Sequence, residues 1–136
     1  MGVRRFVMLL TVALWSMPLF AQQPLKITID VKPGDDKVTL EPEREGMVPI
    51  LIVTTPAFDA ARVDPDTVRI GPGGTEASIF RSMLEDVDKD GDIDRMVLVR
   101  VRDMQIKCGN KVIRLTGKTV DGRPFEGADT VATEGC

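Results

Sequence analysis

The chain has 136 residues, a formal net charge of −3, and neither histidine nor tyrosine. An acidic surface argues against a nucleic-acid-binding protein, because the phosphate backbone would repel it. The absence of histidine removes the commonest general base, so any catalysis would depend on carboxylates or lysines. Two cysteines without histidine also cannot form a typical zinc site.

The first 21 residues have the layout of a secretory signal peptide. Arg4 and Arg5 precede an uncharged apolar run from Phe6 to Phe20, and Ala21 precedes two glutamines. A membrane-spanning helix needs about 20 apolar residues, and this run is shorter. We therefore expect a signal peptide that is cleaved after Ala21. The protein would then be secreted or periplasmic, with no membrane insertion after cleavage. An uncleaved N-terminal anchor is the alternative. The remaining residues 22–136 suit a single domain.

Apolar and polar residues alternate through much of the remaining chain, as is typical of half-buried β-strands. The pattern predicts a helical turn at 58–62, a loop at 71–74 and a turn at Asp121–Gly122. Short strands separated by turns indicate an all-β fold, and we expect a single small β-sandwich, Ig-like or jelly-roll-like, rather than a small barrel. The expected strands are 26–31, 37–41, a central strand at 47–55, 66–70, 96–102, 111–117 and 128–133.

Residues 85–96, EDVDKDGDIDRM, carry an aspartate at every second position from Asp86 to Asp94. Carboxylates this close repel one another unless a cation neutralises them, and hard cations bind oxygen ligands. The spacing predicts a metal loop between two strands. Its side-chain ligands would be Asp86, Asp88 and Asp90, with Gly91 at the bend, Asp92 contributing its backbone carbonyl, and Asp94 binding directly or through water. Ile93 would point into the core. A solvated acidic turn is the alternative.

The segment from Asp86 to Asp94 resembles the DxDxDGxxD calcium loops of dockerin modules, thrombospondin type 3 repeats and integrin α propellers. The propeller version, which lies between two strands, is the closest pattern. The resemblance implies Ca²⁺ as the bound ion but implies no fold. The loop is not a true EF-hand, because its twelfth position is Val97 and not a bidentate glutamate. Without that ligand, we expect weak affinity, about 10⁻⁴–10⁻³ M.

A longer series of motifs runs in order through the chain: IDVKPG at 29–34, VPILIVTT, VDPDTV, LEDVDKDGDID and LTGKTVDGRPFEG, followed by a terminal cysteine. The series resembles a small β-rich module of secreted bacterial proteins to which no activity is assigned. This resemblance implies the fold and the exported location, but no function. Lys89 departs from the pattern, because a glycine is usual there; a position facing solvent should tolerate the lysine.

Cys108 and Cys136 form an even pair in a chain that we expect to be exported. Oxidising compartments favour disulfides, so we expect one bond between them. Closing a loop of nearly thirty residues would stabilise the fold by about 3–4 kcal/mol in the chain-entropy model. Two free thiols or an intermolecular bond are the alternatives.

Three classes of function remain. A non-catalytic binding or structural module, stabilised by Ca²⁺ and one disulfide, agrees with every feature, and its partner would be an extracellular protein or a glycan. A carbohydrate-binding module would usually stack sugars on Trp or Tyr, whereas Trp15 lies in the expected signal peptide and we expect Phe58, Phe80 and Phe125 in the core. A small carboxylate-dependent hydrolase would use acids such as Glu41, Glu43 and Glu45. We expect no enzymatic activity.

Overall fold

The computed structural model describes residues 23–136, so the expected signal peptide at 1–21 lies outside the described residues. The described part is almost entirely β-structure, which confirms the predicted all-β class. Its strands are β1 (Leu25–Lys26), β2 (Ile29–Val31), β3 (Thr39–Leu40), β4 (Met47–Ile52), β5 (Val63–Gly71), β6 (Ala77–Ser78), β7 (Arg81–Glu85), β8 (Asp94–Arg100), β9 (Val112–Thr119), β10 (Pro124–Thr130) and β11 (Ala132–Thr133). Two short 3₁₀ turns, η1 (Ala60–Arg62) and η2 (Arg102–Met104), complete the fold.

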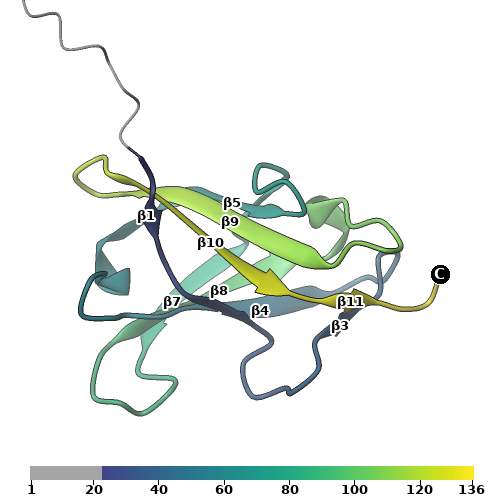
Figure 1. Cartoon of the computed structure of the whole chain (residues 1–136), viewed down its shortest axis with the longest axis horizontal. Helices are drawn as coiled ribbons and strands as arrows, with labels where there is room; N and C mark the ends of the chain where they lie inside the picture. The colour runs from purple at the N-terminus through teal and green to yellow at the C-terminus, as the bar shows by residue number, and fades with distance from the viewer. Residues whose placement is uncertain (1–22) are drawn as a thin grey trace, which may run out of the picture.

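The strands form two main sheets, which lie one above the other in Figure 1 and are consistent with a small β-sandwich. The upper sheet has the strand order β1-β10-β9-β5-β6, and the lower sheet has the order β2-β4-β8-β7. The remaining strands, β3 and β11, pair in parallel as a third, two-stranded sheet. The predicted central strand is therefore internal, because β4 lies between β2 and β8.

The core lies between the two main sheets. Alternate residues of β4 and β8 face inward, and their partners come from β5 and β9. Phe58 and Phe125 are buried against each other, with ring centroids 5.2 Å apart in an edge-to-face arrangement. The fully buried apolar side chains of the four strands are Val48, Ile50, Ile52, Val63, Val68, Ile70, Val97, Val99, Ile113 and Leu115.

Three strand predictions need correction. The segment 26–31 is divided between the two sheets, since β1 pairs with β10 and β2 pairs with β4. Alternation continues across this crossing, so the pattern does not reveal it. The segment 128–133 is also divided, at Val131, between β10 of the upper sheet and β11 of the two-stranded sheet. In contrast, β5 begins before Pro65, because an irregularity in its pairing between Asp64 and Arg69 accommodates the proline.

One aromatic prediction is wrong. Phe58 and Phe125 are in the core, but Phe80 is 52% exposed and lies just before β7. The guanidinium of Arg100 lies 4.8 Å from the centre of its ring. This cation–π contact stabilises an aromatic side chain that the core does not cover.

The predicted disulfide forms between Cys108 and Cys136, with a Cα–Cα distance of 5.9 Å. It ties the C-terminal residue to the turn before β9. No helix within residues 23–136 is both long enough and apolar enough to span a membrane.

Candidate metal site

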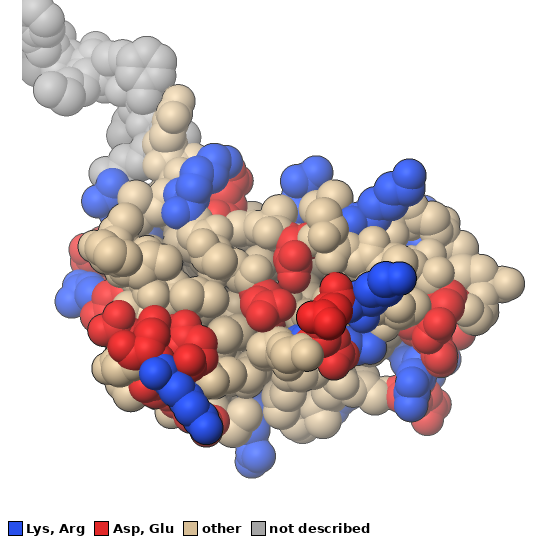
Figure 2. All heavy atoms as spheres, turned by 60° about the horizontal axis from the view of Figure 1, so that its bottom comes forward, with Lys and Arg blue, Asp and Glu red and all other residues tan. Residues whose placement is uncertain are grey.

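The acidic loop, residues 86–94, connects β7 to β8 in the lower sheet. The two strands are antiparallel neighbours, and Glu85 pairs with Asp94 at the last position of their ladder. The sheet therefore fixes both ends of the loop. Figure 2 shows acidic side chains gathered on the face that Figure 1 places at the bottom, where this loop lies.

Four carboxylates converge inside the loop. Asp86, Asp88, Asp90 and Asp94 each offer one oxygen, and these four oxygens lie within 4.8 Å of one another. Calcium binds oxygen at 2.3–2.6 Å, so ligands on opposite sides of the ion are separated by up to about 5 Å. The spacing of the four oxygens therefore suits a single ion of this size.

Local hydrogen bonds curl the loop around its carboxylates. The backbone N–H of Gly91 donates to Asp86 Oδ2 at 3.0 Å, and that of Asp92 donates to Asp90 Oδ1 at 2.9 Å. Gly91 has a φ of 92° and Lys89 has a φ of 57°, both in the left-handed region. Glycine adopts this conformation without a Cβ penalty, which also explains why a glycine would suit the position of Lys89.

Asp94 and Asp86 each leave one carboxylate oxygen unsatisfied. Asp94 is fully buried, and its Oδ1 accepts a hydrogen bond of 2.9 Å from the backbone N–H of Thr54. Its Oδ2, like Oδ1 of Asp86, is buried without a hydrogen-bond partner in the described part of the chain. Leaving a buried acceptor unpaired costs about 1–3 kcal/mol, and more when the group is charged. A cation bound in the loop would remove this cost.

The loop also changes the acidity of one of its members. Partial removal of the Asp88 carboxyl from water, a side-chain hydrogen bond with Asp90 and the charges of Asp94 and Asp90 together raise the pKa of Asp88 to about 6, although the hydrogen bond from the backbone N–H of Asp90 lowers it. Like charges disfavour ionisation of their neighbours. A divalent ion would oppose this effect, because it favours the ionised carboxylates.

The structure brings together the side chains of four predicted metal residues. The carboxylate of Asp92 is not among them, and its predicted role through the backbone carbonyl stays a prediction. The prediction for Ile93 is wrong, because Ile93 is 48% exposed. Neighbouring residues at the start of a strand point in opposite directions. The carboxylate of Asp94 is buried against the backbone of Thr54, whereas the side chain of Ile93 stays largely in solvent.

Thr54 is a supporting residue that the sequence analysis did not identify. Besides the contact of its N–H with Asp94, its hydroxyl donates to the carbonyl of Ile93 at 2.6 Å and accepts from the N–H of Ala60 at 2.9 Å. Thr54 thus links the end of the loop to β4 and η1. Because it lies 40 residues from Asp94, no local spacing could have indicated it.

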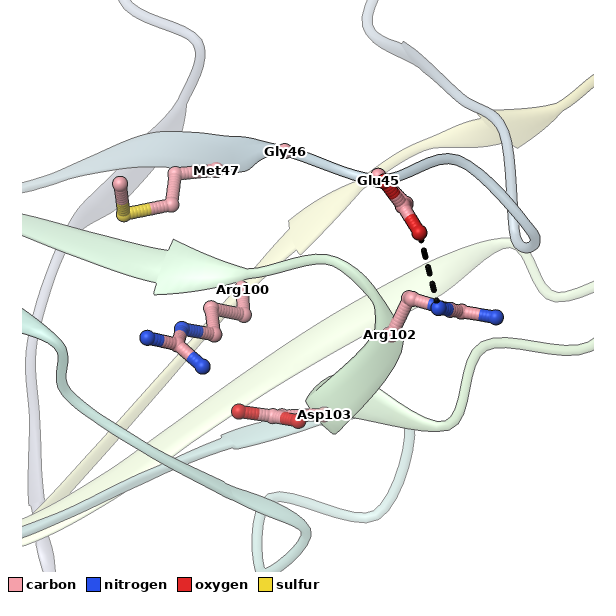
Figure 3. Close-up of a pocket in the computed structure, with 6 residues that line it drawn as sticks. All are labelled: Glu45, Gly46, Met47, Arg100, Arg102 and Asp103. Atoms are coloured by element: carbon pink, nitrogen blue, oxygen red, sulfur yellow. Dashed lines mark hydrogen bonds and ion pairs between the residues drawn. The ribbon is translucent and has the colours of Figure 1, made fainter.

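A second candidate site is a pocket of about 560 Å³ beside β4 and β8, separate from the acidic loop. In Figure 3, Arg102 reaches toward Glu45, and the two side chains form an ion pair of 3.3 Å. Glu41, another acid considered for hydrolysis, lies 4.0 Å from Arg44. These exposed pairs are ordinary surface contacts. The residues lining the pocket are Glu45, Gly46, Met47, Arg100, Arg102 and Asp103.

Comparisons of the chain with protein-family models, curated proteins and solved structures found no match. The resemblances to calcium loops and to an exported bacterial module therefore rest on the motifs alone.

Proposed function

We propose that this protein is an exported, non-catalytic β-sandwich module whose acidic loop binds one calcium ion. The ion neutralises the clustered aspartates and fixes the connection between β7 and β8. The module would then act by binding an extracellular protein or glycan, or as a structural unit. Metal binding and folding are linked in such a site, because the ligands converge only in the folded chain.

The observation that carries this proposal is the pair of unsatisfied buried oxygens, Asp94 Oδ2 and Asp86 Oδ1. A solvated acidic turn would leave its carboxylates in water, whereas Asp94 is completely buried. The donor set consists of carboxylate oxygens, which favours a hard cation. Calcium is preferred over magnesium because several carboxylates cluster in one loop, and because exported proteins meet free calcium.

The proposed non-catalytic role is supported by the side chains that the chain offers. It has no histidine, and two of the acids considered for hydrolysis lie in exposed ion pairs. Location outside the cytoplasm agrees with the disulfide between Cys108 and Cys136. A panel of glycosidase and esterase substrates should give no turnover. Hydrolysis that disappears in a Glu45→Gln variant would contradict this part of the proposal.

The calcium site is tested by thermal unfolding of the protein obtained from the full chain in an exporting host. Circular dichroism is the suitable probe, because the chain has no tyrosine and its one tryptophan, Trp15, lies in the expected signal peptide. At a hundredfold excess of calcium over its Kd, we expect about 2.7 kcal/mol of added stability relative to EGTA. For a domain of this size, that corresponds to a rise in Tm of about 10 °C or more.

Two matched variants separate ligand binding from a general effect of charge. Asp94→Asn and Asp92→Asn each remove one negative charge from the same loop, but only Asp94 belongs to the carboxylate cluster. An asparagine at 94 can still accept the hydrogen bond from Thr54. We expect Asp94→Asn to lose most of the calcium-dependent rise in Tm and Asp92→Asn to keep it. Equal losses in both variants would mean that the loop attracts ions only through its net charge.

A further inference from the structure

The strand β7 is the longest edge strand of the two main sheets. The other edges of these sheets are formed by β1, β2 and β6, which have two or three residues each, whereas β7 has five. In the described chain, β7 pairs with β8 on one side only. Its other side therefore presents backbone N–H and C=O groups that can pair with another strand.

The same edge carries exposed apolar side chains. Phe80, Met83 and Leu84 are three of the six large hydrophobic residues that are exposed in the described part of the chain. Natural proteins usually protect a long edge with short strands, proline or several charges. Here the protection is limited to one charge at each end of β7, Arg81 and Glu85.

An apolar row crosses the outer face of the lower sheet and ends at this edge. Leu51 of β4 pairs with Met96 of β8, and Met96 pairs with Met83 of β7. Directly paired residues lie on the same face of a sheet. Leu51 is buried but is not part of the cluster between the two sheets, which agrees with its place on the outer face. Met83, at the end of the row, is 39% exposed.

We propose that β7 is a self-association edge, at which two copies of this chain pair their β7 strands antiparallel about a two-fold axis at Met83. The sequence of β7, RSMLE, is self-complementary in this arrangement. Arg81 of each copy lies opposite Glu85 of the other, and the two Met83 side chains meet at the centre. The two four-stranded sheets become one sheet of eight strands, and the apolar row continues across the axis.

The charges of Arg81 and Glu85 favour this register over pairings that are shifted along the strand. Neither Arg81 nor Glu85 forms an ion pair within residues 23–136, so both are available to a second copy. A shift of the pairing by two residues would place Arg81 or Glu85 opposite Met83. A parallel, in-register pair would place each charge opposite its own copy, and like charges directly opposite each other are destabilising. The antiparallel pairing also brings Arg81 of one copy beside the start of the acidic loop of the other.

The test is sedimentation equilibrium of the full-chain protein after export, over a range of concentrations, in calcium and again in EGTA. The proposal does not depend on the metal, so dimer formation in either condition supports it. Met83→Lys would place two lysines together at the axis and should weaken dimerisation roughly tenfold or more. Val120→Lys is the control, because Val120 is also an exposed apolar residue but lies in the β9–β10 turn, and it should leave dimerisation unchanged.

Charge-reversal variants test directly whether Arg81 of one copy pairs with Glu85 of the other. Arg81→Glu and Glu85→Arg each place like charges opposite each other, so each variant alone should be monomeric at concentrations where the natural chain is dimeric. An equimolar mixture of the two should form heterodimers, because every cross-strand pair is then opposite in charge. Circular dichroism checks that each variant is folded. A natural chain that stays monomeric at every concentration, or dimers unaffected by Met83→Lys and the charge reversals, would overturn the proposal.

Discussion

Gly91 occupies the one position of the acidic loop where the chain bends with a φ of 92°. No atom lies within 4 Å of the position that a Cβ would take, so the need for glycine comes from backbone conformation and not from space. We expect Gly91→Ala to lower the free energy of unfolding by about 1–2 kcal/mol. Urea denaturation followed by circular dichroism measures this change.

A substitution at Lys89 should have the opposite effect, because Lys89 also lies in the left-handed region but is not a glycine. Its φ of 57° is left-handed, so Lys89→Gly should relieve strain in the folded loop and also remove a positive charge that competes with a cation. We expect tighter calcium binding in this variant and weaker binding in Gly91→Ala. If both substitutions changed the affinity in the same direction, the loop would not have the conformation described above.

Asp30 makes stability depend on pH. Its partial burial, and next the nearby charge of Asp129, raise the pKa of Asp30 above 3.8. The folded state therefore favours the protonated form, so ionised Asp30 destabilises the fold once the pH exceeds its raised pKa. Below pH 3.8, Asp30 is protonated in both the folded and the unfolded chain, and this penalty is absent.

The expected result is that Asp30→Asn is more stable than the natural chain at pH 7 and equally stable below pH 3.8. Urea denaturation at several pH values measures the difference. Asp36→Asn, at an exposed position, is the control and should change stability at neither pH. An Asp30→Asn variant that is less stable at neutral pH would show that the carboxylate makes a favourable contact.

The side-chain placements that could be predicted from sequence were local ones. Four aspartates converge as their spacing indicated, because turn hydrogen bonds act over two to five residues. The exposure of Ile93 was missed because the loop pattern assigns its eighth position to the core, whereas here Asp94 takes the buried place. The contribution of Thr54 depends on the packing of β4 against the loop, and no pattern within either segment records it.

At the level of the secondary-structure elements, one buried arginine connects three of them. Arg95 of β8 donates to the carbonyls of Ala60 and Ala61 in η1, at 3.0 and 3.1 Å, and to the hydroxyl of Ser82 in β7, at 2.6 Å. The guanidinium thus gives a donor to the carbonyl of Ala61 and a second donor to that of Ala60, which also accepts from the backbone N–H of Val63. It also holds η1 beside the strands that carry the acidic loop.

Replacing this residue should loosen all three elements. We expect Arg95→Met to keep much of the apolar packing but to destabilise the fold by about 2–4 kcal/mol, because the carbonyls of Ala60 and Ala61 and the hydroxyl of Ser82 all lose a charged donor. Arg100→Met, on the same strand but exposed, is the matched control and should cost less than about 1 kcal/mol. Equal effects of the two substitutions would contradict the described role of Arg95.

The strands were predicted well where one strand stays in one sheet, as β4, β8 and β9 do. The strand ends were missed where the chain crosses between sheets, at Ile27–Thr28 and at Val131. Residues with alternating polarity suit both sheets, so the alternation does not mark the crossing. The strand β6 was not predicted, and for β7 only a strand of unstated bounds was expected before the metal loop. Most of their side chains are exposed, so they lack the apolar alternation that indicates a half-buried strand.

For the whole molecule, the sandwich, the disulfide and the candidate metal loop act on different parts of the chain. The core between the sheets holds β4, β8, β5 and β9 together, and the disulfide secures the C-terminus. Neither reaches the acidic loop, whose end is held by Thr54 and whose clustered carboxylates repel one another. A cation bound there, as proposed, would therefore stabilise this end of the molecule.

Calcium titration of the metal-stripped protein by isothermal calorimetry tests this account most directly. We predict saturable binding of one calcium ion per chain, with binding lost in Asp94→Asn and kept in Asp92→Asn. A natural chain that binds no calcium at millimolar concentrations, while its disulfide is intact and its fold is native by circular dichroism, would contradict the proposed site.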